Sequence, residues 1–129
     1  MNVFVGDIEK LTEMNESFRE VLFTGKHMQL VVMRLRGGEE IGLEVHHDVD
    51  QFFRVEKGEA EFVFGDLERH IVKSGGAVIV PAGTFHNVIN RSQSHDLKLY
   101  TIYTPPNHPE GTIHATKADA EAAEAKKHN

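Results

Sequence analysis

The sequence predicts an all-β protein, built as a closed barrel or sandwich of short antiparallel strands. Between residues 21 and 104, runs rich in Val, Ile, Leu and Phe alternate with short breaks that contain glycine. The breaks lie at residues 37–38, 57–58, 65–66, 74–76 and 81–83. Short apolar runs separated by regular turns are typical of barrels and sandwiches, in which closure protects the sheet edges.

Each expected strand is a short apolar or alternating run that ends at a glycine break or a polar turn. The expected strands span residues 29–36, 43–46, 51–56, 59–64, 68–72, 77–80, 85–90 and 97–103. We therefore expect the core of the barrel to cover about residues 21–104.

The two ends of the chain carry different patterns. Residues 8–14 mix apolar and charged side chains in a way that fits a short helical turn before the barrel. Thr116, followed three residues later by Asp119, fits a capping box and predicts a helix over residues 117–126. Residues 104–111 are rich in proline, which predicts a connecting loop. The 129 residues predict one domain, 1–129, whose C-terminal loop and helix occupy about residues 105–127.

The composition excludes several classes of function. A net charge of −6 argues against binding to a nucleic-acid backbone, which requires clustered basic residues. The absence of cysteine removes disulfides, thiol chemistry and iron–sulfur ligation, and it fits a reducing cytoplasm. The sequence has neither a secretory signal pattern nor the ~18 apolar residues that a membrane span requires. We therefore expect a soluble, cytoplasmic protein.

Two segments place polar side chains on the inner face of the predicted barrel. Side chains two residues apart in a strand share a face, so Glu44 and His46 project together. After a short turn, Gln51 begins the next expected strand, and a hairpin could bring all three side chains to one point. The second segment holds an apolar strand, a Pro-Ala-Gly turn, and a strand on which His86 and Asn90 share a face.

The second segment resembles a motif of the cupin superfamily, G-x5-P-x-G-x2-H-x3-N. Its fixed positions are all matched, by Gly75, Pro81, Gly83, His86 and Asn90. The first cupin motif, G-x5-H-x-H-x3-4-E-x6-G, is matched in spacing by Gly38, Glu44, His46, Gln51 and Gly58. Glu44 replaces its first histidine, and Gln51 replaces its glutamate. The chain is similar to small single-domain prokaryotic cupins, which sometimes carry a mannose-6-phosphate isomerase-like label.

The resemblance implies a double-stranded β-helix, or jelly-roll, barrel that holds one divalent metal ion. In cupins with the full motif, three imidazoles and one carboxylate bind the ion. Here the implied ligands are Glu44, His46, Gln51 and His86. The carboxylate lost at position 51 is regained at position 44, so the charge of the ligand set is unchanged. An amide oxygen in place of an imidazole favours Mn or Fe over Cu or Zn, although the stability order still allows Zn or Ni.

Three functions are compatible with such a site. The first is a metalloenzyme that acts on a small hydroxy-carbonyl, sugar or carboxylate compound by isomerase-like, lyase-like or dioxygenase chemistry. The catalytic residues stay unknown, because no base is evident in the sequence. The second is a non-catalytic cupin that binds a small ligand. The third is a structural dimer, which leaves the polar interior unexplained. The resemblance also implies a homodimer that pairs through an outer sheet face.

Other residues of chemical interest are expected to serve mainly structure or solubility. His47 should point away from His46 to the surface, and Asp48 and Asp50 should form a solvated turn. His108 and His114 flank a loop that could cover the barrel mouth, where either could transfer a proton. The histidines expected at the surface are His27, His70, His95 and His128. The aromatic residues expected in the core or an interface are Phe52, Phe53, Phe62, Phe64 and Phe85.

Overall fold

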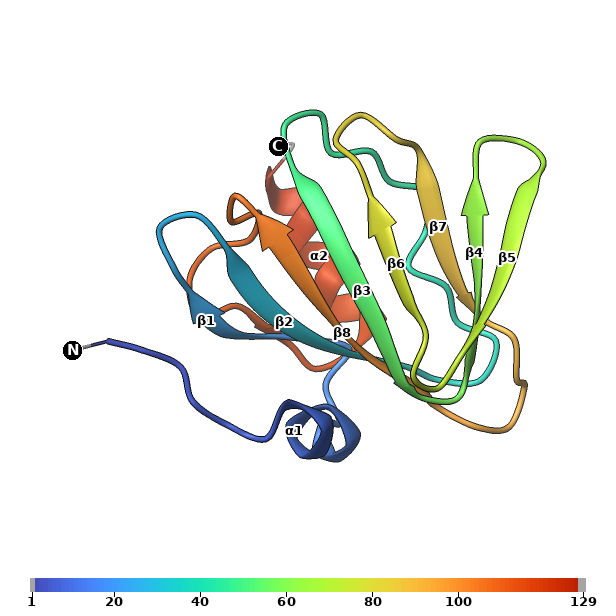
Figure 1. Ribbon diagram of the computed structural model, residues 1–129, viewed down its shortest axis with the longest axis horizontal. Coiled ribbons are helices and arrows are strands. Elements are labelled where there is room, and N and C mark those ends of the chain that lie inside the picture. Colours follow the sequence, from blue (N-terminus) through green and yellow to red (C-terminus); the bar gives the residue numbers. More distant parts are fainter. Residues whose placement is uncertain (1, 128–129) are drawn as a thin grey trace.

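A computed structural model describes residues 2–127, which form two antiparallel β-sheets packed face to face (Figure 1). The larger sheet has six strands, in the order β6 (Ala77–Val80), β3 (Asp50–Lys57), β8 (Leu97–Thr104), β2 (Gln29–Leu35), β1 (Arg19–Thr24) and β9 (Ile113–His114). The smaller sheet has three strands, in the order β5 (Glu68–Lys73), β4 (Glu59–Phe64) and β7 (His86–Asn90). The predicted all-β jelly-roll barrel is confirmed.

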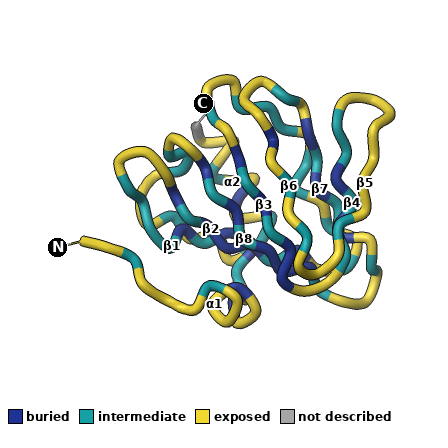
Figure 2. Tube along the Cα trace, in the orientation of Figure 1, coloured by how far each residue is buried: buried dark blue, intermediate teal, exposed yellow. Residues whose placement is uncertain are grey.

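The core lies between the sheets, where the inward side chains of both are buried (Figure 2). Along β3, Phe53 and Val55 are buried and alternate with more exposed neighbours, as the period of a strand requires. Phe53 meets Phe62 of β4 edge to face, with ring centroids 5.1 Å apart. This aromatic contact joins the two sheets at the centre of the barrel.

Two helices lie on opposite sides of the larger sheet. α1 (Ile8–Met14) packs on its outer face, where the carbonyl oxygen of Glu13 accepts a hydrogen bond from the ammonium of Lys98 at 2.5 Å. α2 (Lys117–Lys127) lies on the inner side, behind β8 and β3 in Figure 1. Thr116 Oγ1 accepts the backbone N–H of Asp119 at 3.1 Å, which confirms the predicted N-cap. Within residues 2–127, no helix is long and apolar enough to span a membrane.

One strand prediction was wrong, and two strands were not predicted. Residues 43–46 do not form a regular strand in a hairpin with β3; they lie against β7, joined by an isolated bridge between Glu44 and His86. The backbone at Gly42 has a φ of 106°, which interrupts the extended conformation. The sequence reasoning also missed β1 and β9. In β1 a bulge between Val21 and Phe23 breaks the alternation by which a strand is recognised.

Asn90, the last residue of β7, joins separate segments of the chain. Its Nδ2 donates to the carbonyl oxygens of Leu35, Arg36 and His95, at 3.1, 3.0 and 2.8 Å. Its Oδ1 accepts the N–H of Ser92 at 3.0 Å. The side chain is 1% exposed, so these contacts satisfy backbone groups that water does not reach. The asparagine of the second motif therefore holds the end of β2 against the loop that precedes β8.

Candidate metal centre

The site forms where the two motif segments lie side by side. Glu44 and His86 exchange both backbone hydrogen bonds, each 2.9 Å long. Directly opposed residues of an antiparallel pair project from the same face. The two side chains therefore leave the backbone together, although one belongs to the first motif and the other to the second.

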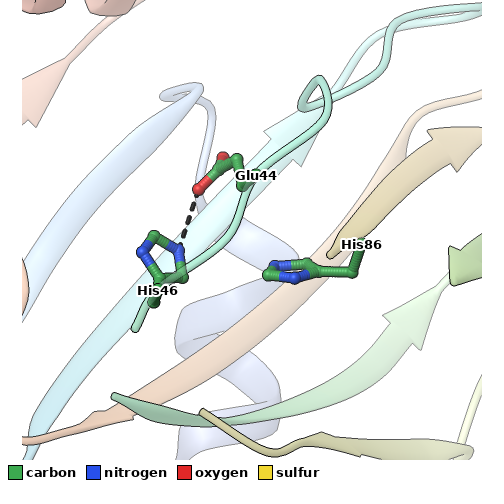
Figure 3. A group of neighbouring side chains, drawn as sticks. All are labelled: Glu44, His46 and His86. Atoms are coloured by element: carbon green, nitrogen blue, oxygen red, sulfur yellow. Dashed lines mark ion pairs between the residues drawn. The ribbon is translucent and has the colours of Figure 1, made fainter. Parts of the chain in front are cut away.

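His46 joins this pair from the same segment as Glu44 (Figure 3). Its carbonyl oxygen accepts the N–H of Gly83 at 2.8 Å, which ties the segment to the turn before β7. His46 Nε2 lies 2.9 Å from Glu44 Oε2. Glu44, His46 and His86 each offer one ligand atom, and these atoms all lie within 4.8 Å of one another. This group could hold a metal ion.

The ring of His86 is oriented by the backbone. His86 Nδ1 lies 2.9 Å from the carbonyl oxygen of Thr84, so Nδ1 carries the proton and donates it. Nε2 is then the unprotonated nitrogen, the form in which histidine binds metals. The residue is 3% exposed, and its ring packs 6.1 Å from that of Phe53. The turn before β7 thus orients the ring of His86 through the carbonyl oxygen of Thr84. It also holds the backbone of His46 through the N–H of Gly83.

Gln51 reaches the interior from the opposite sheet. It pairs with Tyr103 of β8, whose ring lies 5.8 Å from that of His46. Gln51 Nε2 donates to Thr101 Oγ1 at 2.9 Å. Within the described chain, the buried Gln51 Oε1 has no hydrogen-bond partner. His46 Nε2 is also buried, and Glu44 Oε2 lies 2.9 Å from it. Buried polar atoms without partners are rare, so the unsatisfied Gln51 Oε1 requires a partner that the side chains around it do not supply.

The electrostatics keep one carboxylate charged in the site. Burial opposes the ionisation of Glu44, but the contact with His46 and the charge of Arg19 outweigh it, so the pKa of Glu44 lies below its ordinary value. Burial raises the pKa of Tyr103, so its phenol stays protonated at neutral pH. An ionised carboxylate and two imidazoles form a donor set that suits a divalent cation.

A cavity of about 460 Å³ adjoins this group, a volume within the range of small-molecule pockets. Glu44 and His46 line it, together with Arg19 of β1, His108 and one side of α2. His108 Nε2 lies 3.2 Å from the Tyr103 hydroxyl, so the predicted loop histidine lies at the cavity. Sequence reasoning missed Arg19 and Tyr103. The alternation along β8 could have placed Tyr103 inward, but nothing in the sequence pairs it with Arg19.

The other candidate residues lie apart from this centre. His47 is exposed, as predicted, and so is Asp48. Asp50 Oδ1 accepts the N–H of Ala82 at 2.8 Å, so this carboxylate serves the turn. His70 pairs with Glu68 on the exposed β5. His128 lies outside the described residues.

Comparisons with known proteins agree with this fold. The chain is 52% identical over 126 residues to the uncharacterized protein YrkC of Bacillus subtilis (strain 168), a match that covers 94% of this chain and 67% of that protein. It is 42% identical over 113 residues to the uncharacterized protein L612 of Acanthamoeba polyphaga mimivirus, covering 86% of this chain and 71% of that protein. These relatives extend the likeness beyond the barrel core.

Solved structures and a family profile give the same result. The crystal structure of BH2720 from Bacillus halodurans has a TM-score of 0.90 and 45% identity, covering 94% of this chain and 95% of that one. The crystal structure of TT1209 from Thermus thermophilus has a TM-score of 0.67 and 25% identity, covering 78% of this chain and 96% of that one. The family described as Cupin domain matches residues 31–103. This range includes both motif segments, and the chain belongs to the cupin superfamily.

Proposed function

We propose that this cupin binds one divalent metal ion through Glu44, His46, Gln51 and His86 and acts on a small, oxygen-rich compound in the adjoining cavity. The observation that carries the proposal is the group of Glu44, His46 and His86, whose ligand atoms all lie within 4.8 Å of one another, together with the buried Gln51 Oε1, which has no hydrogen-bond partner among the described residues. A cation bound by this group would offset the negative charge of Glu44 and supply a partner for Gln51 Oε1. Two oxygen and two nitrogen ligands favour Mn or Fe, with Zn or Ni as alternatives.

The reaction class follows from what the cavity offers. A divalent ion would polarise a carbonyl or hydroxyl oxygen of the bound compound as a Lewis acid. His108 lines the cavity, and its Nε2 lies 3.2 Å from the protonated Tyr103 hydroxyl, so Tyr103 orients an imidazole that can exchange a proton with a bound compound. This pair favours a metalloenzyme with isomerase-like or lyase-like chemistry on a hydroxy-carbonyl, sugar or carboxylate compound, whereas dioxygenase chemistry would require Fe or Mn. The alternative, a non-catalytic cupin, would bind the same compounds without turnover.

Metal analysis tests the ligand set. Protein without a histidine tag, incubated with Mn²⁺ and then desalted, is expected to retain about one ion per chain by mass spectrometry of the metal. Glu44→Ala and His86→Ala are expected to lower the affinity at least about 100-fold, because loss of even a supporting contact costs about 10- to 100-fold.

His47→Ala is the matched control, since it removes an exposed imidazole next to His46. It should retain metal like the wild type. Equal metal content in the wild type, Glu44→Ala and His86→Ala would contradict the proposed site.

We also propose that the chain forms a homodimer through the outer face of the larger sheet. The strand registers place five apolar side chains in one row across that face, Phe23, Leu30, Ile102, Phe52 and Ile79. Ile79 is 70% exposed at the edge strand β6. An apolar row of this kind is typical of an isologous interface, in which the same patch meets its copy. The single domain of residues 1–129 and the cytoplasmic location stay predictions.

Light scattering coupled to size-exclusion chromatography measures this association. The wild type is expected to elute with the mass of two chains. Ile79→Asp is expected to elute as one chain, because a carboxylate in the row would be buried without a partner. Leu67→Asp is the control, since Leu67 is 91% exposed in a turn away from the row. A wild type that is monomeric at tens of micromolar, or an Ile79→Asp variant that stays dimeric, would contradict the dimer.

A further inference from the structure

We propose that Arg19 binds the carboxylate of a small organic acid in the cavity beside Glu44 and His46. Arg19 is the first residue of β1. It pairs with Met33 of β2, an inward residue of the larger sheet, so its side chain enters the barrel. Arg19 is 8% exposed and lines the cavity. A guanidinium so deeply buried requires polar partners.

The partners of Arg19 are incomplete. Arg19 Nη1 lies 3.4 Å from His114 Nδ1, a long contact, and the guanidinium lies 5.3 Å from the centre of the Phe18 ring. Arg19 Nε is buried and has no hydrogen-bond partner, and no carboxylate forms an ion pair with Arg19 among residues 2–127. Arg34 and Arg69 are more exposed, yet each pairs with a carboxylate. Arg19 thus combines deep burial with an unused donor.

A carboxylate is the group that this donor set recognises. The planar guanidinium presents parallel N–H groups that match the two oxygens of a carboxylate. The buried Tyr103 lies close to both Arg19 and Glu44, and its hydroxyl stays protonated, so it adds no negative charge beside the guanidinium. The charge of Arg19 helps to lower the pKa of Glu44, but the two side chains form no ion pair. The charge of Arg19 is therefore available to an anion that enters the cavity.

The charge of the whole cavity favours an acid with more than one negative group. A divalent ion and Arg19 together would carry three positive charges, against one negative charge on Glu44. This part of the inference rests on the proposed function, whereas the carboxylate site at Arg19 does not. Lys117 and Glu121 of α2 also line the cavity, but they face each other at 3.9 Å near solvent. Glu124 is exposed, so solvent screens its charge more than that of the buried Arg19.

Titration calorimetry with simple dicarboxylates tests this assignment. Malonate, succinate and glutarate serve as probes of increasing length, and their diamides serve as neutral controls of similar shape. At least one dicarboxylate is expected to bind Mn²⁺-loaded protein, and more tightly than its diamide. Arg19→Met is expected to weaken that binding by about tenfold or more, because it removes charge-assisted hydrogen bonds. Arg19→Lys should restore part of the affinity, since lysine keeps the positive charge but lacks the parallel N–H groups of the guanidinium.

Two further measurements separate binding from structure. At saturating Mn²⁺, Arg19→Met should still bind the metal, and its thermal unfolding midpoint should change little, because the contacts of Arg19 with His114 and Phe18 are long. A large loss of stability would instead identify Arg19 as structural and overturn the proposal. No dicarboxylate binding to the wild type at millimolar concentrations, or equal affinities in the wild type and Arg19→Met, would overturn it as well. The dicarboxylates can also be titrated into metal-free protein. If they bind there and Arg19→Met weakens that binding, the carboxylate site at Arg19 is supported even if the metal proposal fails.

Discussion

Replacing Asn90 with aspartate is expected to destabilise the protein by about 3 to 4 kcal/mol. The substitution replaces a buried NH₂ group, which donates to carbonyl oxygens, with a carboxylate oxygen, which can only accept. Asn90 Nδ2 donates to Leu35, Arg36 and His95, and aspartate can donate to none of them while it is ionised. Each buried carbonyl left without a partner costs about 1 to 3 kcal/mol. Urea unfolding followed by circular dichroism measures the loss as a lower midpoint at an unchanged slope.

Asn87→Asp is the matched control for this substitution. Asn87 lies on the same strand, and its Nδ2 contacts the carboxylate of Glu40 at 3.2 Å in an exposed position. The control also places a negative charge beside Glu40, yet water screens that pair, so its cost should stay below about 1 kcal/mol. Similar midpoints for Asn90→Asp and Asn87→Asp would show that Asn90 does not join the segments as described.

Replacing Gln51 with glutamate is expected to make the stability of the protein depend on metal. The new carboxylate would be buried on the wall that carries Tyr103, which already interacts with the charge of Glu44. Without a cation, a second buried charge should cost about 3 kcal/mol and lower the unfolding midpoint by roughly 10 °C in EDTA. With Mn²⁺, the same carboxylate becomes a strong ligand, so binding to the folded state restores the midpoint.

Thermal unfolding in EDTA and in Mn²⁺ measures this difference. Gln93→Glu is the control, because Gln93 is exposed and the same change of charge there should leave the midpoint independent of metal. The wild type should show a smaller metal effect than Gln51→Glu. If Mn²⁺ failed to stabilise Gln51→Glu, residue 51 would not be a ligand.

Much of the fold followed from local patterns. The strands at residues 59–64 and 77–80 were predicted with their observed bounds, because glycine turns delimit each of them. The bulged β1 was missed because the extra residue between Val21 and Phe23 shifts the alternation. The path of residues 43–46 was wrong for a different reason. Their bonding to β7 is a long-range contact, and a positive φ at Gly42 makes the segment too irregular to read as a strand.

The candidate site was predictable only in part. The motif spacing led to Glu44, His46 and His86, and the structure brings their ligand atoms together. The hairpin that was expected to bring Glu44, His46 and Gln51 together is absent, and a bridge between Glu44 and His86 joins the two motif segments instead. Arg19 could not have been found, because its inward direction depends on the register of a strand that the sequence pattern did not reveal.

The bridge between Glu44 and His86 also has a consequence for the order of folding. The two residues lie far apart along the chain, so their meeting requires closure of a long loop, which is entropically costly and slow. No local hairpin can preassemble this centre before the sheets meet. A metal ion should therefore be captured after the barrel closes, unlike the zinc of small metal-nucleated domains that are unfolded without it. Once bound, the ion would link the segment of Glu44 and His46 to that of His86, and its main effect would be a slower rate of unfolding.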